Sequence, residues 1–321
     1  MLVAVSDSVF PNLDPARQVL ASIGAELTMA DAPTPDAIVR AAAPADALLV
    51  TYAKITADMI EQMPRCRIIS RFGIGVDNVD LAAATGKGIV VTKVPDYCID
   101  EVSDHTMALL LALVRKIPSS SARTHAGRWE MKAVVPIHRL RGSVIGLVGF
   151  GRIPQLVAPK AQSFGMKVLA FDPFVPADVF TRAGVERVEF LELLRRSDYV
   201  SVHTPLMPET RGLFNTDTFA QMKPGAYLVN TARGPIIDEG ALAEALDAGT
   251  VAGAALDVMT QEPPPPSPLF GRDNVIITPH TSFYSEESLV ELQTKAAQEV
   301  VAVLSGNAPR NPVNPEALAH K

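Results

Sequence analysis

Short apolar runs alternate with helix-length segments along nearly the whole chain, and this alternation constrains the fold more than any other feature. In the N-terminal part the runs are residues 2–6, 47–51, 68–72 and 89–93. They are apolar at consecutive positions, which is typical of strands buried on both faces of a parallel sheet. The sequence therefore predicts a small α/β domain in this part of the chain.

A second series of strands is predicted between two longer helices. Residues 101–117 carry acidic residues in the first turn and Arg115 and Lys116 at the end, with Pro118 directly after. The other helix is predicted at residues 285–305 because its apolar residues share one face. The strands predicted between them are residues 144–148, 168–172, 199–203, 227–231, 254–258 and 275–278. Six such strands are typical of a doubly wound nucleotide-binding domain.

The composition excludes several classes of protein. A chain of 321 residues is long enough for two domains. Its net charge of -6 argues against a nucleic-acid partner, because duplex binding needs clustered Lys and Arg. Residues 107–114, the longest apolar run, are too few for a membrane-spanning helix, which needs roughly 20 residues. Cys66 and Cys98 have no metal-ligand spacing, so we expect a cytoplasmic protein without a bound metal.

A glycine motif lies where a predicted strand meets a predicted helix. Gly149 permits a tight turn, and Gly151 lets the backbone approach a pyrophosphate. The N–H groups of Arg152 and Ile153 then begin the helix and favour an anion. Asp172 ends the next strand, where its carboxylate can bind the adenine ribose of NAD and repel the 2′-phosphate of NADP. The alternative for Asp172 is a turn residue, which is common for Asp before Pro.

Two prolines depart from the usual dinucleotide pattern. Pro154 stands where a third glycine is expected, and its ring should push the helix outward. Proline is tolerated in a first helical turn, so phosphate binding can survive. Pro159 lies deeper in the same segment and predicts a bent helix.

Three polar residues each follow a predicted strand: Arg233, Glu262 and His280. Ligands of open α/β sheets bind beyond the carboxyl ends of strands, so these side chains are predicted to converge. A guanidinium can bind a carboxylate and polarise a carbonyl, an imidazolium can donate a proton, and a carboxylate can orient the imidazole. Singly, each residue has an ordinary alternative as an ion pair, a solvated side chain or a structural histidine. The combination favours hydride transfer to a keto acid.

Weaker candidates have open alternatives. The N–H groups of Ile74 and Gly75 could bind a carboxylate, or this segment could be a plain tight turn. His203 ends a predicted strand and could line a cofactor groove or be a buried structural histidine. The remaining histidines have no supporting partner in the sequence and are interpreted as structural. They are His105, His125, His138 and His320.

At this point the chain resembles a known family, the D-isomer-specific 2-hydroxyacid dehydrogenases. The motifs that carry the resemblance are residues 149–153 with Asp172, 202–206, 230–234, 255–258 with Glu262, and 278–280. The resemblance implies that Arg233, Glu262 and His280 are catalytic. It implies the substrate-binding residues Arg71, Ile74, Gly75 and Phe283. It implies the cofactor-binding residues Thr106, Gly149, Gly151, Arg152, Ile153, Asp172, His203, Thr204, Pro205, Thr210, Thr231, Ala232 and Asp257, with Asp257 on the nicotinamide carboxamide.

The same resemblance implies the domain organisation and the reaction. Residues 1–97 and 286–321 are expected to form a discontinuous, flavodoxin-like substrate domain, and residues 98–285 a Rossmann NAD-binding domain. The expected reaction interconverts a D-2-hydroxy acid and its 2-keto acid with NAD. The family is usually dimeric, so a homodimer centred on residues 101–117 is also expected.

Within the family, residues 96–105 and 280–286 look most like the branch of the C-terminal-binding proteins, which are NAD-binding corepressors. Phe283 is predicted to face the substrate pocket, which puts the smallest substrates in doubt. The alternative function is therefore an NAD(H)-sensing interaction module with little turnover. A third alternative is a relative that has lost its cofactor through Pro154.

Overall fold

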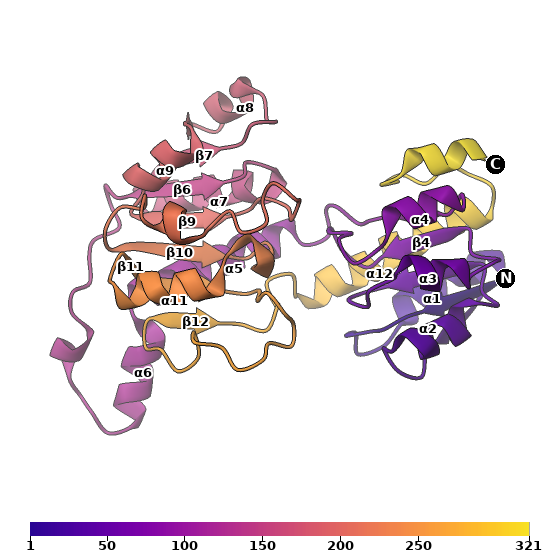
Figure 1. Ribbon diagram of the computed structural model, residues 1–321, viewed down its shortest axis with the longest axis horizontal. Coiled ribbons are helices and arrows are strands. Elements are labelled where there is room, and N and C mark those ends of the chain that lie inside the picture. The colour runs from indigo at the N-terminus through magenta and orange to yellow at the C-terminus, as the bar shows by residue number, and fades with distance from the viewer. Residues whose placement is uncertain (321) are drawn as a thin grey trace. The chain divides into compact units, whose positions relative to one another are not determined.

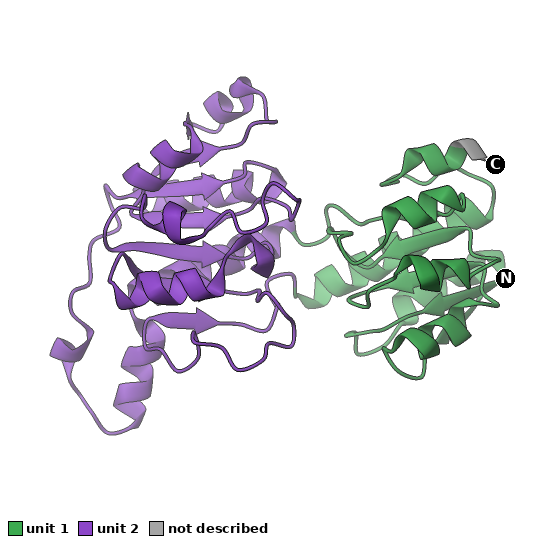
Figure 2. Ribbon diagram, in the orientation of Figure 1, with its two compact units in different colours: residues 1–98, 284–321 green, residues 99–283 purple. Residues whose placement is uncertain are grey.

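The computed structural model describes residues 1–320 and divides into two compact units (Figure 2). Unit 1 combines residues 1–98 with the C-terminal part of the chain from Tyr284 onward. Unit 2 is the continuous segment between them, residues 99–283. Each unit contains its own parallel sheet.

The sheet of unit 1 has five parallel strands in the order β2-β1-β3-β4-β5, which is the flavodoxin-like order. The strands are β1 (Leu2–Val5), β2 (Glu26–Met29), β3 (Ala47–Val50), β4 (Ile68–Arg71) and β5 (Val90–Thr92). Four of them lie where the apolar runs predict strands. The strand β2 has no counterpart among the predicted strands, because this edge strand has no fully buried residue and no apolar run.

Helices cover the sheet of unit 1. They are α1 (Asp14–Leu20), α2 (Pro35–Ala42), α3 (Ala57–Glu61), α4 (Leu81–Gly86) and α12 (Glu286–Leu304), with the 3-10 helices η1 (Ala21–Ile23) and η4 (Pro315–His320). The helix α12 packs against α1 and β4, and Ser70 Oγ donates to Ala296 O at 3.0 Å. Ser285 and Ser288 form a capping box at its N-terminus, which explains the predicted start at residue 285.

The sheet of unit 2 has seven parallel strands in the order β12-β11-β10-β9-β6-β7-β8 (Figure 1). They are β6 (Val144–Val148), β7 (Lys167–Phe171), β8 (Glu186–Arg187), β9 (Tyr199–Val202), β10 (Ala226–Asn230), β11 (Val251–Leu256) and β12 (Val275–Ile277). Counted from β6, the first six strands follow the Rossmann order, with β12 added at the edge. Only β8 lacks a prediction, because its two residues are exposed and charged.

The helices of unit 2 are α5 (Ile99–Val114), α6 (Ile117–His125), α7 (Arg152–Ser163), α8 (Ala177–Arg182), α9 (Phe190–Arg196), α10 (Thr216–Phe219) and α11 (Glu239–Asp247), with the 3-10 helices η2 (Met131–Val134) and η3 (Gly234–Ile236). The prediction of one helix over residues 101–117 is wrong at its end. Lys116 has a left-handed backbone with φ 53°, which separates α5 from α6. Pro118 lies in the first turn of α6, where proline is favourable, rather than beyond a helix end.

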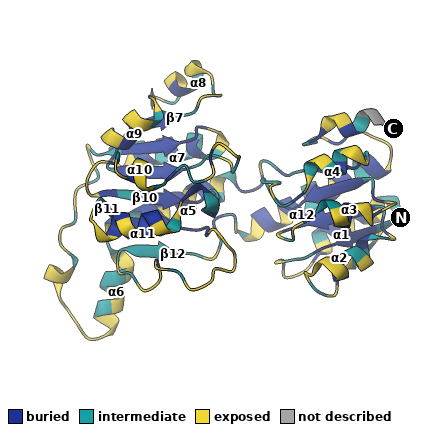
Figure 3. Ribbon diagram, viewed as in Figure 1, coloured by how far each residue is buried: buried dark blue, intermediate teal, exposed yellow. Residues whose placement is uncertain are grey.

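The two sheets are largely buried, whereas one long segment lies on the surface (Figure 3). The strands β3, β4, β5, β6 and β9 are almost fully buried, as their continuous apolar runs predict. Between α5 and β6, by contrast, every residue from 117 to 142 is exposed or only partly buried. Within the described residues, no helix has the length and apolar character that crossing a membrane requires.

Candidate functional site

An imidazole and a carboxylate meet in unit 2 beyond the ends of two neighbouring strands. His280 follows β12 and Glu262 follows β11, and His280 Nδ1 lies 2.6 Å from Glu262 Oε2. The other carboxylate oxygen, Oε1, accepts a hydrogen bond from Met259 N at 3.1 Å. The Glu262 carboxylate therefore fixes the orientation of the imidazole ring.

Asp257 holds the backbone that carries His280. His280 has a φ of 53°, a conformation that is unfavourable for a residue with a side chain. Its N–H donates to Asp257 O at 2.8 Å, and the buried Asp257 carboxylate accepts from Thr281 N and Ser282 N, both at 2.9 Å. Asp257 thus stabilises the turn around His280, a role that the sequence pattern did not indicate.

A second imidazole joins this network: His105, for which the sequence indicates no partner and which is interpreted there as structural. His105 Nε2 lies 3.2 Å from Thr278 Oγ1 and 3.6 Å from Asp257 Oδ1. Thr278 Oγ1 donates its hydrogen to Asp257 Oδ1 at 2.6 Å. The hydroxyl can then only accept from His105, so the imidazole carries its proton on Nε2. The link runs between α5 and β12 and is invisible in the sequence.

Arg233 follows β10, the strand on the other side of β11. Its Nη1 donates to Ala232 O at 2.8 Å, and Asn230 Nδ2 donates to Arg233 O at 2.9 Å. At Gly234 an added Cβ would lie 2.0 Å from the backbone of Met259, so the segments that carry Arg233 and Glu262 abut closely. Phe283 lies edge-on to the His280 ring, with ring centroids 6.2 Å apart.

The glycine loop has the geometry of an anion-binding turn. Gly149 has a φ of 94°, and an added Cβ would lie 2.9 Å from the backbone of His203, so only glycine is tolerated there. At Gly151 an added Cβ would meet no atom within 4 Å. Gln155 N makes the first bond of α7, to Gly151 O, so the preceding N–H groups have no intrahelical acceptor. Such a helix start favours a phosphate.

Pro154 costs this helix little. It is the third residue of α7 and precedes the first intrahelical donor, so the N–H that proline lacks would have had no acceptor in the helix. Pro159 lies inside α7, which the structure shows as one continuous helix, and the bend stays a prediction.

Asp172 is a turn residue, because its carboxylate accepts backbone hydrogen bonds from two loops. Its Oδ1 accepts from Phe174 N and Val175 N, at 2.9 and 3.2 Å, and its Oδ2 accepts from Phe150 N at 2.9 Å. The carboxylate therefore ties the loop after β7 to the glycine loop after β6. Of the two alternatives left open by the sequence, the turn is shown, and contact with a ribose stays a prediction.

Hydroxyl groups of the other predicted cofactor residues form local links. Thr106 Oγ1 lies 2.9 Å from Thr231 Oγ1, which joins α5 to the end of β10. Thr210 Oγ1 donates to Pro205 O at 2.7 Å and thereby shapes the segment that begins with Thr204. His203 Nε2 lies 2.9 Å from Ser201 Oγ, and burial lowers the pKa of the imidazole to about 3. His203 is therefore neutral at physiological pH.

The predicted substrate residues of unit 1 follow β4. Arg71 is buried, and its Nη1 donates to Phe72 O at 2.7 Å. Gly73 N donates to Arg71 O, which makes the turn before Ile74 and Gly75. Among residues 1–320, no hydrogen-bond acceptor is found for the N–H groups of Ile74 and Gly75. A tight turn with two partly buried residues whose N–H groups have no such acceptor is consistent with both alternatives that the sequence left open.

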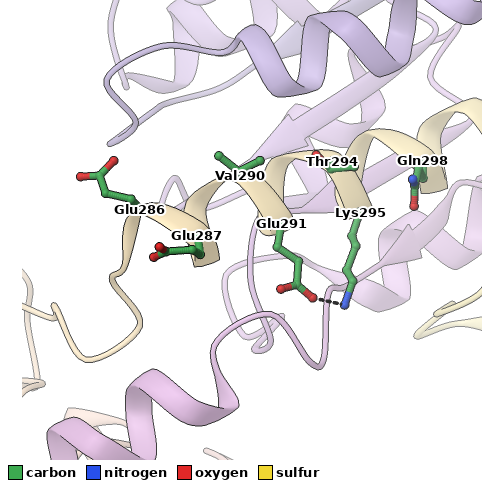
Figure 4. A pocket seen from close by; sticks show the side chains of 7 residues that line it. All are labelled: Glu286, Glu287, Val290, Glu291, Thr294, Lys295 and Gln298. Carbon is green, nitrogen blue, oxygen red and sulfur yellow. Dashed lines mark ion pairs between the residues drawn. The ribbon is translucent and has the colours of Figure 1, made fainter.

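None of the predicted site residues lines the shallow depression along α12 (Figure 4). It is formed by Glu286, Glu287, Val290, Glu291, Thr294, Lys295 and Gln298, and Lys295 pairs with Glu291 at 2.5 Å. Within residues 1–320 there is also no group of three or more His, Cys, Asp or Glu side chains that could hold a metal ion.

The neutral state of His203 predicts a specific acid sensitivity. An unfolded histidine binds a proton below about pH 6.5, whereas folded His203 stays neutral to about pH 3. Stability from this residue is therefore complete above pH 6.5 and decreases as the pH falls towards 3. Between pH 7 and 5 the unfolding free energy should fall about 1–2 kcal/mol less in His203→Gln than in the wild type, measured by urea denaturation. Parallel pH dependences would contradict it.

Comparisons with known proteins identify the family. Residues 107–282 match the family model "D-isomer specific 2-hydroxyacid dehydrogenase, NAD binding domain". The chain is 40% identical to the D-3-phosphoglycerate dehydrogenase of Methanocaldococcus jannaschii over 95% of its length, and 38% identical to the human enzyme of that name over 98%. It spans 58% and 59% of the lengths of these two relatives.

Solved structures show the same fold. A D-lactate dehydrogenase from Aquifex aeolicus, complexed with NAD and lactic acid, superimposes with a TM-score of 0.88 at 29% identity, covering 98% of this chain and 99% of that one. The family and the α/β fold that the sequence motifs predict are thereby confirmed. The chain belongs to the D-isomer specific 2-hydroxyacid dehydrogenases.

Proposed function

We propose that this protein is an NAD-dependent D-2-hydroxyacid dehydrogenase that reduces a 2-keto acid to the D-2-hydroxy acid, or catalyses the reverse reaction, in the cytoplasm. The observation that carries the proposal is the pair of His280 Nδ1 and Glu262 Oε2 at 2.6 Å, beyond the carboxyl ends of the strands of a Rossmann sheet. The names of the relatives, phosphoglycerate and lactate dehydrogenases, support the substrate class.

Each side chain of the set has one task. NADH, when bound, supplies the hydride that forms the new C–H bond at C2. His280, protonated and oriented by Glu262, donates the proton from Nε2 to the C2 oxygen, so the carbonyl becomes an alcohol and the imidazole becomes neutral. Arg233 binds the substrate carboxylate and polarises the carbonyl. In the oxidising direction the neutral imidazole accepts the same proton.

The cofactor residues divide by the part of NAD that they hold. The N-terminus of α7, with Gly151, Arg152 and Ile153, binds the pyrophosphate. The Asp172 carboxylate accepts three backbone hydrogen bonds in its turn. Its remaining lone pairs would accept hydrogen bonds from the hydroxyl groups of the adenine ribose. The buried Asp257 carboxylate already accepts from Thr278 Oγ1, Thr281 N and Ser282 N, and it would in addition bind the nicotinamide carboxamide. The residues proposed to line the rest of the groove are Thr106, Gly149, His203, Thr204, Pro205, Thr210, Thr231 and Ala232.

Substrate specificity is assigned to other side chains. The N–H groups of Ile74 and Gly75 in unit 1 would bind the substrate carboxylate, with Arg71 behind them. Phe283, edge-on to His280, would limit the size and shape of the C3 substituent. The proposed domains, residues 1–97 with 286–321 for substrate and 98–285 for NAD, assign these tasks accordingly.

A homodimer is the proposed state of the enzyme. The segment that joins α5 to β6 carries large apolar side chains on its surface, among them Trp129 at 90% and Met131 at 74% exposure. It extends away from the sheet of unit 2 (Figure 1). Exposed clusters of this kind are typical of association surfaces, and a second copy would cover them next to α5, where the family resemblance centres the dimer.

Replacement of His280 tests the proton donor. His280→Ala should lower kcat/KM for the reduction of a 2-keto acid about 10³-fold, because general acid catalysis contributes roughly 10²- to 10⁴-fold. NADH affinity should change little. The assay follows NADH consumption with glyoxylate, pyruvate, hydroxypyruvate, its phosphate ester, and branched or aryl 2-keto acids.

Glu244→Ala removes an exposed carboxylate of the same unit and serves as the control. Unchanged turnover in His280→Ala would contradict the assignment. Tight NADH binding by the wild type without turnover on any of these acids would instead favour the NAD(H)-sensing alternative. Absence of NADH binding would favour the third alternative, in which this protein has lost its cofactor through Pro154.

A pair of glycine variants separates folding from cofactor approach. Gly149→Ala places a Cβ against the His203 backbone at positive φ, so the melting temperature should fall by several degrees. Gly151→Ala has space for its Cβ in the protein, so the melting temperature should stay near that of the wild type. Its NADH affinity, measured by fluorescence titration, should still fall about tenfold or more, because the methyl group obstructs the pyrophosphate. Unchanged NADH affinity in Gly151→Ala would contradict the proposed binding mode.

The proposed dimer has a built-in probe, because Trp129 is the only tryptophan. Dilution should shift its emission to longer wavelength as the dimer dissociates. Trp129→Ser with Met131→Ser should sediment as a monomer at concentrations where the wild type is dimeric. Phe174→Ser, which alters an equally exposed side chain of unit 2, should remain dimeric. A monomeric wild type, or a dimeric double variant, would overturn the proposed interface.

A further inference from the structure

The segment that carries Glu262 has few groups with which to attach itself to the domain. Residues 260–266 are exposed, and residues 263–266 are four consecutive prolines, with another at 268. Proline has no N–H, so these prolines cannot donate backbone hydrogen bonds. Whatever fixes Glu262 in place must act through the residues on either side of the prolines.

Glu239 contacts the segment on both sides of the prolines. Its Oε1 accepts from Thr260 N at 2.7 Å, and its Oε2 accepts from Ser267 Oγ at 3.3 Å. Glu239 is the first residue of α11, and the positive end of that helix stabilises a carboxylate there. The preceding Asp238 already caps the helix by accepting from Gly240 N and Ala241 N. The carboxylate of Glu239 is therefore not needed as a helix cap.

The attachment lies next to the catalytic pair. Thr260 is two residues before Glu262, and the adjacent Met259 N donates to Glu262 Oε1 at 3.1 Å. On its other side the backbone of Met259 abuts Gly234. A displacement of Thr260 would therefore be transmitted to the carboxylate that holds His280 Nδ1.

We propose that Glu239 is a positioning residue: its carboxylate holds residues 260–267 so that Glu262 stays on His280. This inference rests on the proposed function, in which Glu262 and His280 handle the proton. Glu239 is not among the residues proposed to contact the substrate or the cofactor. Its loss should therefore change proton transfer and leave NADH binding intact.

The test compares three single variants over a pH series of kcat/KM for keto-acid reduction. An imidazolium that loses its carboxylate partner releases its proton at lower pH. In Glu239→Ala the midpoint of the alkaline fall in activity should move to lower pH, and kcat/KM at neutral pH should fall about tenfold. Glu239→Gln retains one acceptor for Thr260 N, so it should lie between Glu239→Ala and the wild type. Glu244→Ala, an exposed carboxylate of the same helix, should match the wild type.

Two further measurements keep the outcomes distinct. NADH affinity by fluorescence should stay within about twofold in Glu239→Ala. If that variant does not fold, Ser267→Ala removes one of the two contacts and should shift the pH midpoint in the same direction by less. Glu262→Gln provides the reference: if it shifts the midpoint and Glu239→Ala does not, the inference about Glu239 is overturned while the proposed function stands. If Glu262→Gln itself leaves the pH profile unchanged, the proposed role of Glu262 and His280 in proton transfer is contradicted, whatever Glu239 does.

Discussion

The hydrogen bond between His280 Nδ1 and Glu262 Oε2, 2.6 Å long, is the contact on which the functional account depends. Both residues lie on irregular segments rather than on helices or strands, so secondary structure alone does not fix their positions. Asp257 holds the turn around His280 through its backbone and its carboxylate, and the close approach at Gly234 supports the segment that leads to Glu262. The parallel sheet thus places the ends of β10, β11 and β12 side by side. The contacts of the buried Asp257 and the close packing at Gly234 then hold Glu262 and His280 within hydrogen-bond distance.

Two carboxylates of unit 2 have a structural role besides the binding role proposed for them. Asp172 is needed to shape the loops after β6 and β7 before it can meet a ribose. Asp257 is saturated largely by the backbone of residues 281–282 and the Thr278 hydroxyl, with His105 behind it. Substitution of such a residue alters both the binding group and the scaffold, so loss of activity alone does not separate the two functions. A variant that retains the melting temperature, as expected of Gly151→Ala, separates the binding function from the structural one.

Most of the fold was predictable from the sequence, for a physical reason. Strands buried on both faces must be apolar at consecutive positions, and runs such as residues 144–148 carry that signature. The strands β2 and β8 lie at sheet edges with exposed or partly exposed residues, so the signature is absent. The break at Lys116 depends on one backbone torsion, and Pro118 is compatible with a helix end as well as a helix start.

The candidate site was predictable only in part. Strand ends followed by Arg, Glu and His, together with the family motifs, indicate which residues are chemically active. The contacts of His105 and Glu239 join residues 173 and 21 positions apart, and no local pattern encodes them. Such long-range hydrogen bonds arise from the packing of finished elements, which the composition and periodicity of one sequence do not determine.

The most direct test of the central claim is a crystal structure of the protein with NADH and oxamate, an unreactive analogue of a 2-keto acid. The account predicts His280 Nε2 within hydrogen-bond distance of the analogue's C2 oxygen, the Arg233 guanidinium on the same oxygen or the carboxylate, and Glu262 still on Nδ1. An analogue bound beside the nicotinamide but out of reach of both Arg233 and His280 would contradict it.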